Sequence, residues 1–138
     1  VARVAASLPD VGFYLGRWGD RPVPFPNAFP LPDMLLLGEM AVVYADCFCG
    51  IRTVARDGFP NGPVEMAIMG RPTAHVADVG APWIEVAPDA DAIAAFVRRA
   101  RAATGPDLAL AAAARVHVAD RSFLALDTVA ATAVGYAP

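Results

Sequence analysis

The chain has 138 residues, of which 57% are hydrophobic, and a formal net charge of -3. This length is typical of one domain with ample material for a core, and the acidic balance argues against a nucleic-acid binder, which needs a basic face. No uncharged apolar run reaches the ~18 residues of a membrane-spanning helix, and no signal peptide is recognisable at the start. We therefore expect a protein that does not enter a membrane, and the two cysteines discussed below, which we expect to be reduced, indicate a cytoplasmic one.

The first part of the chain predicts a strand at 11–15, followed by a proline-rich extended segment at 17–33. Alternating prolines exclude a helix there and remove hydrogen-bond donors. Trp18, Phe25 and Phe29 are interleaved with the prolines, so we expect this segment to pack against another surface.

The most apolar stretch follows the proline-rich segment. Its spacing predicts a helix at 34–45, with Asp33 as a candidate cap. A buried strand at 40–45 is the competing interpretation.

The middle of the chain reads as a series of short strands. Residues 51–56 and 64–69 are strand-like and flank a dense turn signal at 57–63, which predicts a hairpin. Further short strands are expected at 73–79 and 83–86.

The clearest helix signal covers 89–104. Asp89 and Asp91 stand in its first turn, and Arg98, Arg99 and Arg101 near its end, as the helix dipole favours. Gly105 and the proline after it predict where it stops. In the tail, strand-like runs at 116–119 and 123–134 are predicted to pair.

Together these elements predict a single α+β domain over 1–138. We expect a mostly antiparallel sheet covered by the 89–104 helix, with a second helix possible at 34–45.

Both histidines of the chain begin the same tetrapeptide, His-Val-Ala-Asp, at 75–78 and at 117–120. Histidine titrates near neutral pH, and a carboxylate can orient it for proton transfer or help it hold a metal. The structural alternative is two strands that each end at an Asp-containing turn.

If one pair is functional, we expect it to be His75 with Asp78, because glycines and prolines around this pair favour a bend that turns both side chains into one cleft. His117 stands between valines, where a structural role is more natural. The sequence therefore predicts His75 and Asp78 as catalytic acid–base residues.

Cys47 and Cys49 are too close for an ordinary structural disulfide. Two thiols at this spacing are candidates for a soft metal or for redox chemistry, or are simply small buried apolar groups. Zinc patterns need a second pair of ligands, which is lacking, so we expect reduced thiols, no bound metal and no cofactor.

Glu39 lies within the most apolar stretch. If buried, its pKa would rise as a general acid requires; alternatively it points to water. Arg52 and Arg71 flank the predicted hairpin and are candidates for binding a substrate carboxylate or phosphate, or are ordinary surface arginines.

Two function classes follow. The first is a small cytoplasmic enzyme that performs acid–base chemistry on a small metabolite in a pocket between subunits. The second is a non-catalytic binding or assembly subunit that docks through its proline-rich aromatic segment. The excess of apolar residues on a short chain predicts a homo-oligomer in either case.

Overall fold

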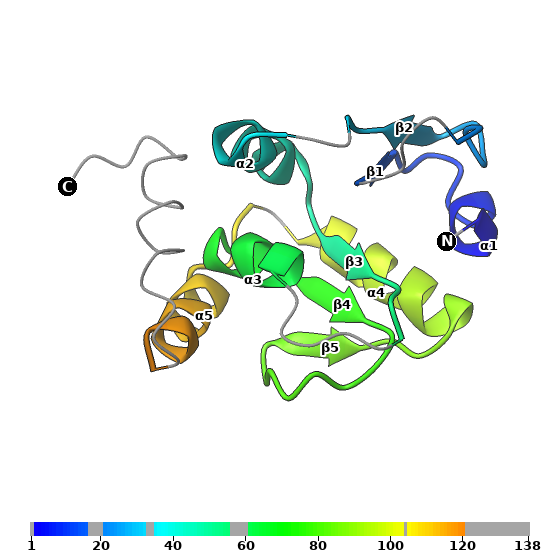
Figure 1. Cartoon of the computed structure of the whole chain (residues 1–138). Helices are drawn as coiled ribbons and strands as arrows, with labels where there is room; N and C mark the ends of the chain where they lie inside the picture. Colours follow the sequence, from blue (N-terminus) through cyan, green and yellow to red (C-terminus); the bar gives the residue numbers. More distant parts are fainter. Residues whose placement is uncertain (1, 17–20, 33–34, 56–60, 104, 121–138) are drawn as a thin grey trace.

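The computed structural model describes residues 2–16, 21–32, 35–55, 61–103 and 105–120. Within these ranges the chain forms five helices and two small parallel sheets (Figure 1). The elements in chain order are α1 (Ala2–Ala6), β1 (Phe13–Leu15), β2 (Ala28–Pro30), α2 (Leu37–Asp46), β3 (Gly50–Arg52), α3 (Asn61–Ile68), β4 (Thr73–His75), β5 (Ile84–Val86), α4 (Ala90–Ala102) and α5 (Leu108–Asp120). The predicted α+β class is correct, but the antiparallel sheet is wrong.

The larger sheet has the strand order β3-β4-β5, and all its neighbours are parallel. Parallel pairing requires a crossover between strands, and α3 supplies it between β3 and β4. The predicted hairpin is wrong because the second of its strands, 64–69, belongs mostly to α3.

A helix forms in place of that strand because its buried side chains follow helical spacing. Val64, Ala67 and Ile68 are each at most 1% exposed and stand three and four residues apart, as one helix face requires. Pro63 lies in the first turn, where the missing N–H removes no helical hydrogen bond.

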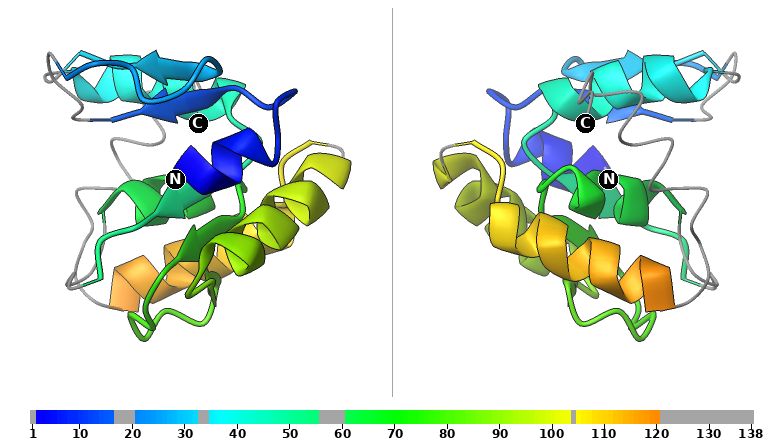
Figure 2. Two further views of the ribbon diagram at one scale, coloured as in Figure 1. Left: turned by 90° about the vertical axis from the view of Figure 1, so that its right-hand side faces the viewer. Right: turned by 90° about the vertical axis from the view of Figure 1, so that its left-hand side faces the viewer.

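The two faces of the larger sheet are covered by different helices (Figures 1 and 2). Ala74 belongs to the main core cluster together with Ile93 and Val97 of α4. Because side chains alternate along a strand, Thr73 and His75 face the other side, where α3 lies. The sheet is therefore the middle layer between α4 and the helix pair α3 and α5.

α5 packs against α3 through Ala114 and Val118. The strand predicted at 116–119 is wrong, since this run lies within α5. Alanine is the strongest helix former, and Asp107 accepts a hydrogen bond from the backbone N–H of Leu110 at 3.0 Å in the first turn. The strand predicted at 123–134 lies outside the described residues.

The junction between α3 and α5 requires a glycine. Gly70 has φ of +72°, and a Cβ there would lie 2.7 Å from the carbonyl oxygen of Asp107. Only glycine combines this conformation with so close an approach, so Gly70 fixes where α5 begins relative to the end of α3.

The smaller sheet pairs β1 with β2 in parallel and lies with α2 above the larger sheet in Figure 1. β2 falls inside the proline-rich segment, and Phe25 of that segment packs edge-on against Phe13 with the ring centres 5.9 Å apart. Figure 2 shows α1 between this layer and α4. The proline-rich segment therefore packs against the rest of the chain through Phe25, which is 9% exposed. Trp18 lies outside the described residues.

Both predicted helices are present, and the competing strand at 40–45 is wrong. α2 spans Leu37–Asp46. α4 spans Ala90–Ala102, and Asp89 caps it by accepting hydrogen bonds from the backbone N–H groups of Asp91 and Ala92. No helix in the described part of the chain is long and apolar enough to cross a membrane.

Candidate binding cavity

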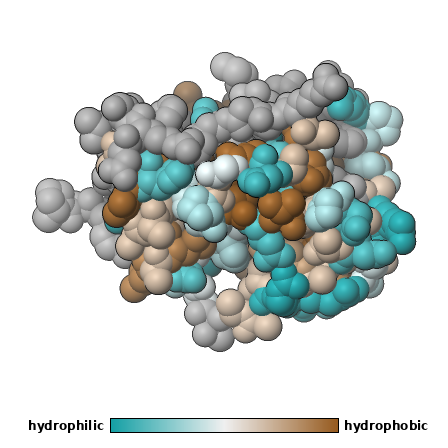
Figure 3. All heavy atoms as spheres, turned by 90° about the horizontal axis from the view of Figure 1, so that it is seen from below, coloured by the Kyte–Doolittle hydropathy of each residue, from teal (hydrophilic) through white to brown (hydrophobic). Residues whose placement is uncertain are grey.

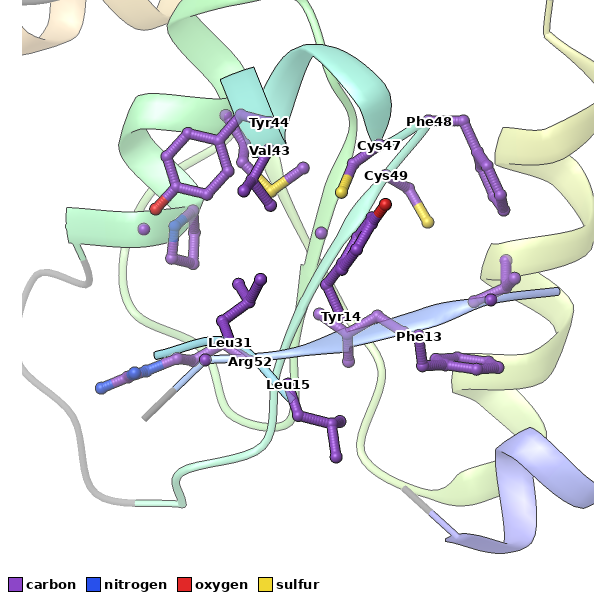
Figure 4. A pocket seen from close by; sticks show the side chains of 18 of the residues that line it. Phe13, Tyr14, Leu15, Leu31, Val43, Tyr44, Cys47, Phe48, Cys49 and Arg52 are labelled. Carbon is purple, nitrogen blue, oxygen red and sulfur yellow. The ribbon is translucent and has the colours of Figure 1, made fainter. Parts of the chain in front are cut away.

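A cavity of about 620 Å³ lies between the β1–β2 layer and the larger sheet (Figure 4). Its walls come from Val4 of α1, the segment that holds β1, residues of and after β2, α2 with the chain after it to Val54, α3, and the inner face of α4. This volume is in the range of small-molecule binding pockets, ~300–1,000 Å³. The cavity is formed within one chain, whereas the sequence interpretation placed the pocket between subunits.

The cavity lining is mostly apolar with a few polar groups. The apolar side chains include Phe13, Leu15, Leu31, Val43, Phe48, Met66 and Val97. The polar side chains are those of Tyr14, Tyr44, Asp46, Cys47, Cys49, Arg52 and Thr53. An apolar pocket with a few placed polar groups is the usual composition of a site for an organic molecule.

Tyr14 stands at the open side of the cavity, since 44% of its surface is exposed. Its hydroxyl group donates a 2.7 Å hydrogen bond to Asp46 Oδ2. This bond and the negative charge of Asp46 raise the pKa of Tyr14, so its proton is held on the phenol. The phenol oxygen still has lone pairs with which to accept a bond from a ligand.

Tyr44 forms another part of the wall and joins α2 to α3. Its hydroxyl group donates a 2.9 Å hydrogen bond to Glu65 Oε2. Burial raises the pKa of Glu65, and the bond from Tyr44 offsets only part of that rise. A carboxyl group with a raised pKa behind a cavity wall is a candidate proton donor, and sequence reasoning selected Glu39 rather than Glu65.

Cys47 and Cys49 both line the cavity and both are free thiols. Burial is the main cause that raises the pKa of Cys47 to about 11 and that of Cys49 to about 12. The charge of Asp46 adds to the shift at Cys47. Both groups are therefore neutral thiols at physiological pH and poor nucleophiles.

The two candidate arginines lie at opposite ends of the strands of the larger sheet. Arg52 ends β3 beside His75, which ends β4, because these two residues are register partners in the parallel pair. Arg71 precedes β4, so it lies at the amino edge, and its Nη2 atom donates to the carbonyl oxygen of Ala45 at 2.7 Å. Arg52 lines the cavity, and Arg71 lines a separate small pocket.

His75 and Asp78 both lie at the carboxyl edge of the sheet, where parallel sheets usually bind ligands. His75 is 1% exposed, and its Nδ1 atom accepts a 3.0 Å hydrogen bond from the backbone N–H of Ala77. Asp78 is exposed and accepts a 2.8 Å bond from the backbone N–H of Gly80. Each of these side chains thus supports its own loop, and neither is among the described residues that line the cavity.

The second tetrapeptide lies on α5, so its setting differs from the first. The ring of His117 packs edge-on against Trp83 with a centre distance of 5.9 Å. His75 faces the side of the larger sheet that α3 covers, and His117 lies on α5. Both histidines are therefore on the same side of this sheet. The repeat therefore occurs once at a strand end and once within a helix, as two unrelated local structures.

Glu39 is exposed in the first turn of α2. Its Oε2 atom accepts a 2.7 Å hydrogen bond from the backbone N–H of Leu36. Such a bond satisfies one of the free amides at a helix start. The burial on which a general-acid role for Glu39 would depend is not found.

Sequence reasoning missed Tyr14, Tyr44 and Glu65. No motif joins them, since they come from β1, α2 and α3. Among the described residues, no group of three or more His, Cys, Asp or Glu side chains is placed to hold a metal ion.

Comparison with known proteins assigns the chain to no family. No protein-family model matches the chain, and neither the curated proteins nor the solved structures contain a significant match. The site therefore has to be interpreted from its own chemistry.

Proposed function

We propose that this protein binds a small, mainly apolar organic molecule in the cavity between its two sheets. The observation that carries the proposal is the cavity itself: about 620 Å³, with a mostly apolar lining and a few polar side chains. Burying apolar ligand surface there supplies the affinity. Tyr14 and Arg52 supply the polar contacts that orient the ligand. We place this activity in the cytoplasm, as expected from the sequence.

The neighbouring residues Val42 and Val43 on α2 provide a matched test. Val43 lines the cavity, whereas Val42 is 69% exposed on the outer side of the helix. Val43→Phe fills part of the cavity, and Val42→Phe adds the same ring outside it. The probe is 8-anilinonaphthalene-1-sulfonate, whose fluorescence rises when it enters an apolar site.

We expect Val43→Phe to weaken saturable binding of the probe roughly tenfold, which corresponds to ~1.4 kcal/mol. Val42→Phe should leave the dissociation constant within about twofold of the original, because it leaves the cavity open. Equal affinities for all three proteins would place the probe elsewhere and remove the support for a binding cavity.

An acid–base enzyme is a second candidate, and Glu65 is the observation that favours it. Its raised pKa makes it a candidate proton donor, and it accepts a hydrogen bond from Tyr44, which lines the cavity and would relay the proton to a bound molecule. Glu65→Gln distinguishes the two proposals, because it removes the exchangeable carboxyl proton and keeps an acceptor for Tyr44. Retained probe binding with lost turnover of a substrate supports the enzyme.

Docking of a partner through the proline-rich segment has weaker support. Phe25 is used in the core against Phe13. Phe29 is 52% exposed, and its ring lies 6.0 Å from that of Tyr14 at the cavity rim. The exposed aromatic surface of this segment therefore adjoins the cavity.

A further inference from the structure

The chain geometry after α2 places two thiols on one side. Cys47 caps the helix with extended backbone angles, φ of -79° and ψ of 143°. The chain then bends at Phe48, and Cys47 and Cys49 on either side of this bend both line the cavity. Figure 4 shows both sulfur atoms beside the ring of Tyr14, with Phe48 directed toward α4. Phe48 and Cys49 both pack against the main core cluster, which holds this segment in place.

The surroundings of the pair restrict what it can bind. Both thiols are partly buried, and the carboxylate of Asp46 acts on Cys47. An adduct that carries a negative charge is unfavourable in such a place. Two thiolates around a monovalent soft metal carry one net negative charge. A trivalent oxoacid instead arrives neutral, reacts with two neutral thiols and leaves a neutral product.

We infer that Cys47 and Cys49 form a dithiol site for a trivalent arsenic oxoacid or its organic derivative at the wall of the cavity. Two arsenic–oxygen bonds break and two arsenic–sulfur bonds form. The two thiol protons leave with the two hydroxide groups as two molecules of water, and arsenic stays trivalent. The third arsenic bond keeps its own hydroxyl or organic group, so two protein ligands complete the site.

The cavity adds a preference among such compounds. An aryl group on arsenic would extend from the thiols into the space lined by Val43 and Leu15, where burial of its apolar surface adds affinity. The dithiol reaction does not depend on the proposed function, because it needs only the two thiols and room beside them.

The test titrates the full, reduced chain with phenylarsine oxide and follows three quantities: intact mass, free thiols and melting temperature. The chain has only two cysteines, so every thiol lost reports on this pair. We expect one arsenical per chain with loss of both thiols. Cys47→Ser and Cys49→Ser should each bind at least ~10²-fold more weakly, because the second bond is then no longer intramolecular.

The change in melting temperature distinguishes a site that exists in the folded protein from two cysteines that would react equally well in an unfolded chain. A compound that binds the folded state more tightly than the unfolded state raises the melting temperature, so we expect a rise for the original chain and none for either serine variant. An unchanged or lowered melting temperature of the original chain overturns the inference, because the folded pair would then bind no better than the unfolded peptide. Loss of one thiol per arsenical also overturns it. Both results come from the original chain, so they stand even if a serine variant misfolds.

Discussion

The hydroxyl group of Tyr44 lies 2.9 Å from Glu65 Oε2, so that a hydrogen bond joins α2 to α3 beside the cavity. Tyr44 lines the cavity and Glu65 stands behind it. This pair connects α2 of the upper layer to α3, which covers one face of the larger sheet. The protonation state of Glu65 therefore bears on stability.

Glu65→Gln should make stability less dependent on pH. The pKa of Glu65 is raised above its ordinary value of 4.5, so the folded state favours the protonated form. The contribution of Glu65 to stability is therefore complete below pH 4.5 and is lost as the pH rises through the raised pKa. The glutamine variant keeps an acceptor for Tyr44 and has no such loss.

Urea unfolding of both proteins between pH 4 and pH 8 measures the effect. The free energy of unfolding of the original chain should fall relative to the variant as the pH rises. Glu85→Gln, on an exposed residue of β5, is the control. A stability difference that stays constant over this range would contradict the assignment of a raised pKa to Glu65.

Phe96→Ala should destabilise the protein by ~3–5 kcal/mol, the usual cost for a large buried ring. Phe96 is 4% exposed on the inner face of α4, within the main core cluster. Arg98→Ala, on the exposed face of the same helix, should change stability by less than about 0.5 kcal/mol. Chemical denaturation of both variants measures the difference, and a loss below ~1 kcal/mol for Phe96→Ala would mean that α4 packs differently.

The elements predicted correctly are those whose signals are local. Asp89 caps α4, and Ile93, Phe96, Val97 and Ala100 form a stripe at helical spacing that faces the core. Such a stripe requires burial wherever the helix packs. The apolar spacing around α2 is also a local signal, and it favoured a helix over the competing strand at 40–45.

The parallel sheet was not predictable in this way, because pairing joins residues far apart in the sequence. The run 64–69 is compatible with a strand and with a helix, and burial between β3, β4 and α5 decides for the helix. Because α3 crosses over between β3 and β4, these two strands pair in parallel. Arg52 and Arg71, which were predicted to flank a hairpin, therefore lie at opposite ends of the strands. The wrong prediction for 64–69 therefore led to the wrong type of sheet and to the wrong arrangement of the two candidate arginines.

The cavity was not predictable because six separate segments build its wall. Tyr14, Tyr44 and Cys49 have no common spacing in the sequence, and only the packing of the smaller sheet over the larger one brings them together. Sequence reasoning instead selected a repeated tetrapeptide, whose two copies serve different local structures.

Cys47 and Cys49 should react slowly with iodoacetamide at neutral pH. Their pKa values of about 11 and about 12 leave little thiolate, so alkylation at pH 8 should be on the order of 10²-fold slower than that of free glutathione. The rate should rise steadily up to at least pH 10. A plateau near pH 8.5, as for an exposed thiol, would contradict burial of the pair. Metal analysis of the same sample should find no stoichiometric zinc or iron.

His75→Ala should destabilise the protein by about 2–3 kcal/mol, because it leaves a cavity and removes the acceptor for the N–H of Ala77. This expectation revises the simple catalytic interpretation, in which only function would be lost. His117→Ala should cost less, since His117 is only partly buried. Thermal melting of both variants gives the comparison, and an equal or larger loss for His117→Ala would contradict it.

Asp78→Asn tests the hypothesis that His75 and Asp78 act together on a ligand. Asparagine keeps the oxygen that accepts from the N–H of Gly80, so the fold should be unchanged within about 0.5 kcal/mol. If His75 and Asp78 act together on a ligand, the variant should lose activity or binding while its melting temperature stays the same. Unchanged function in a stable variant would remove Asp78 from the site.

Self-association, expected from the apolar composition, should depend on the outer face of α5. Leu108 and Val116 are 78% and 63% exposed there, and Ala112 between them is exposed on the same side. Apolar areas also interrupt the hydrophilic surface of the face seen in Figure 3. Exposed apolar side chains that share one helix face are often covered by a partner. A second copy of this chain would bury the same stripe on both subunits in a two-fold interface.

Light scattering at micromolar concentration should therefore give at least a dimer mass for the original chain and a monomer mass for Val116→Asp, since a buried unpaired carboxylate opposes association. Val42→Asp, which places the same charge on an exposed position of α2, should leave the larger mass unchanged. A monomer mass for the original chain would exclude self-association. A larger mass that survives Val116→Asp would move the interface away from α5.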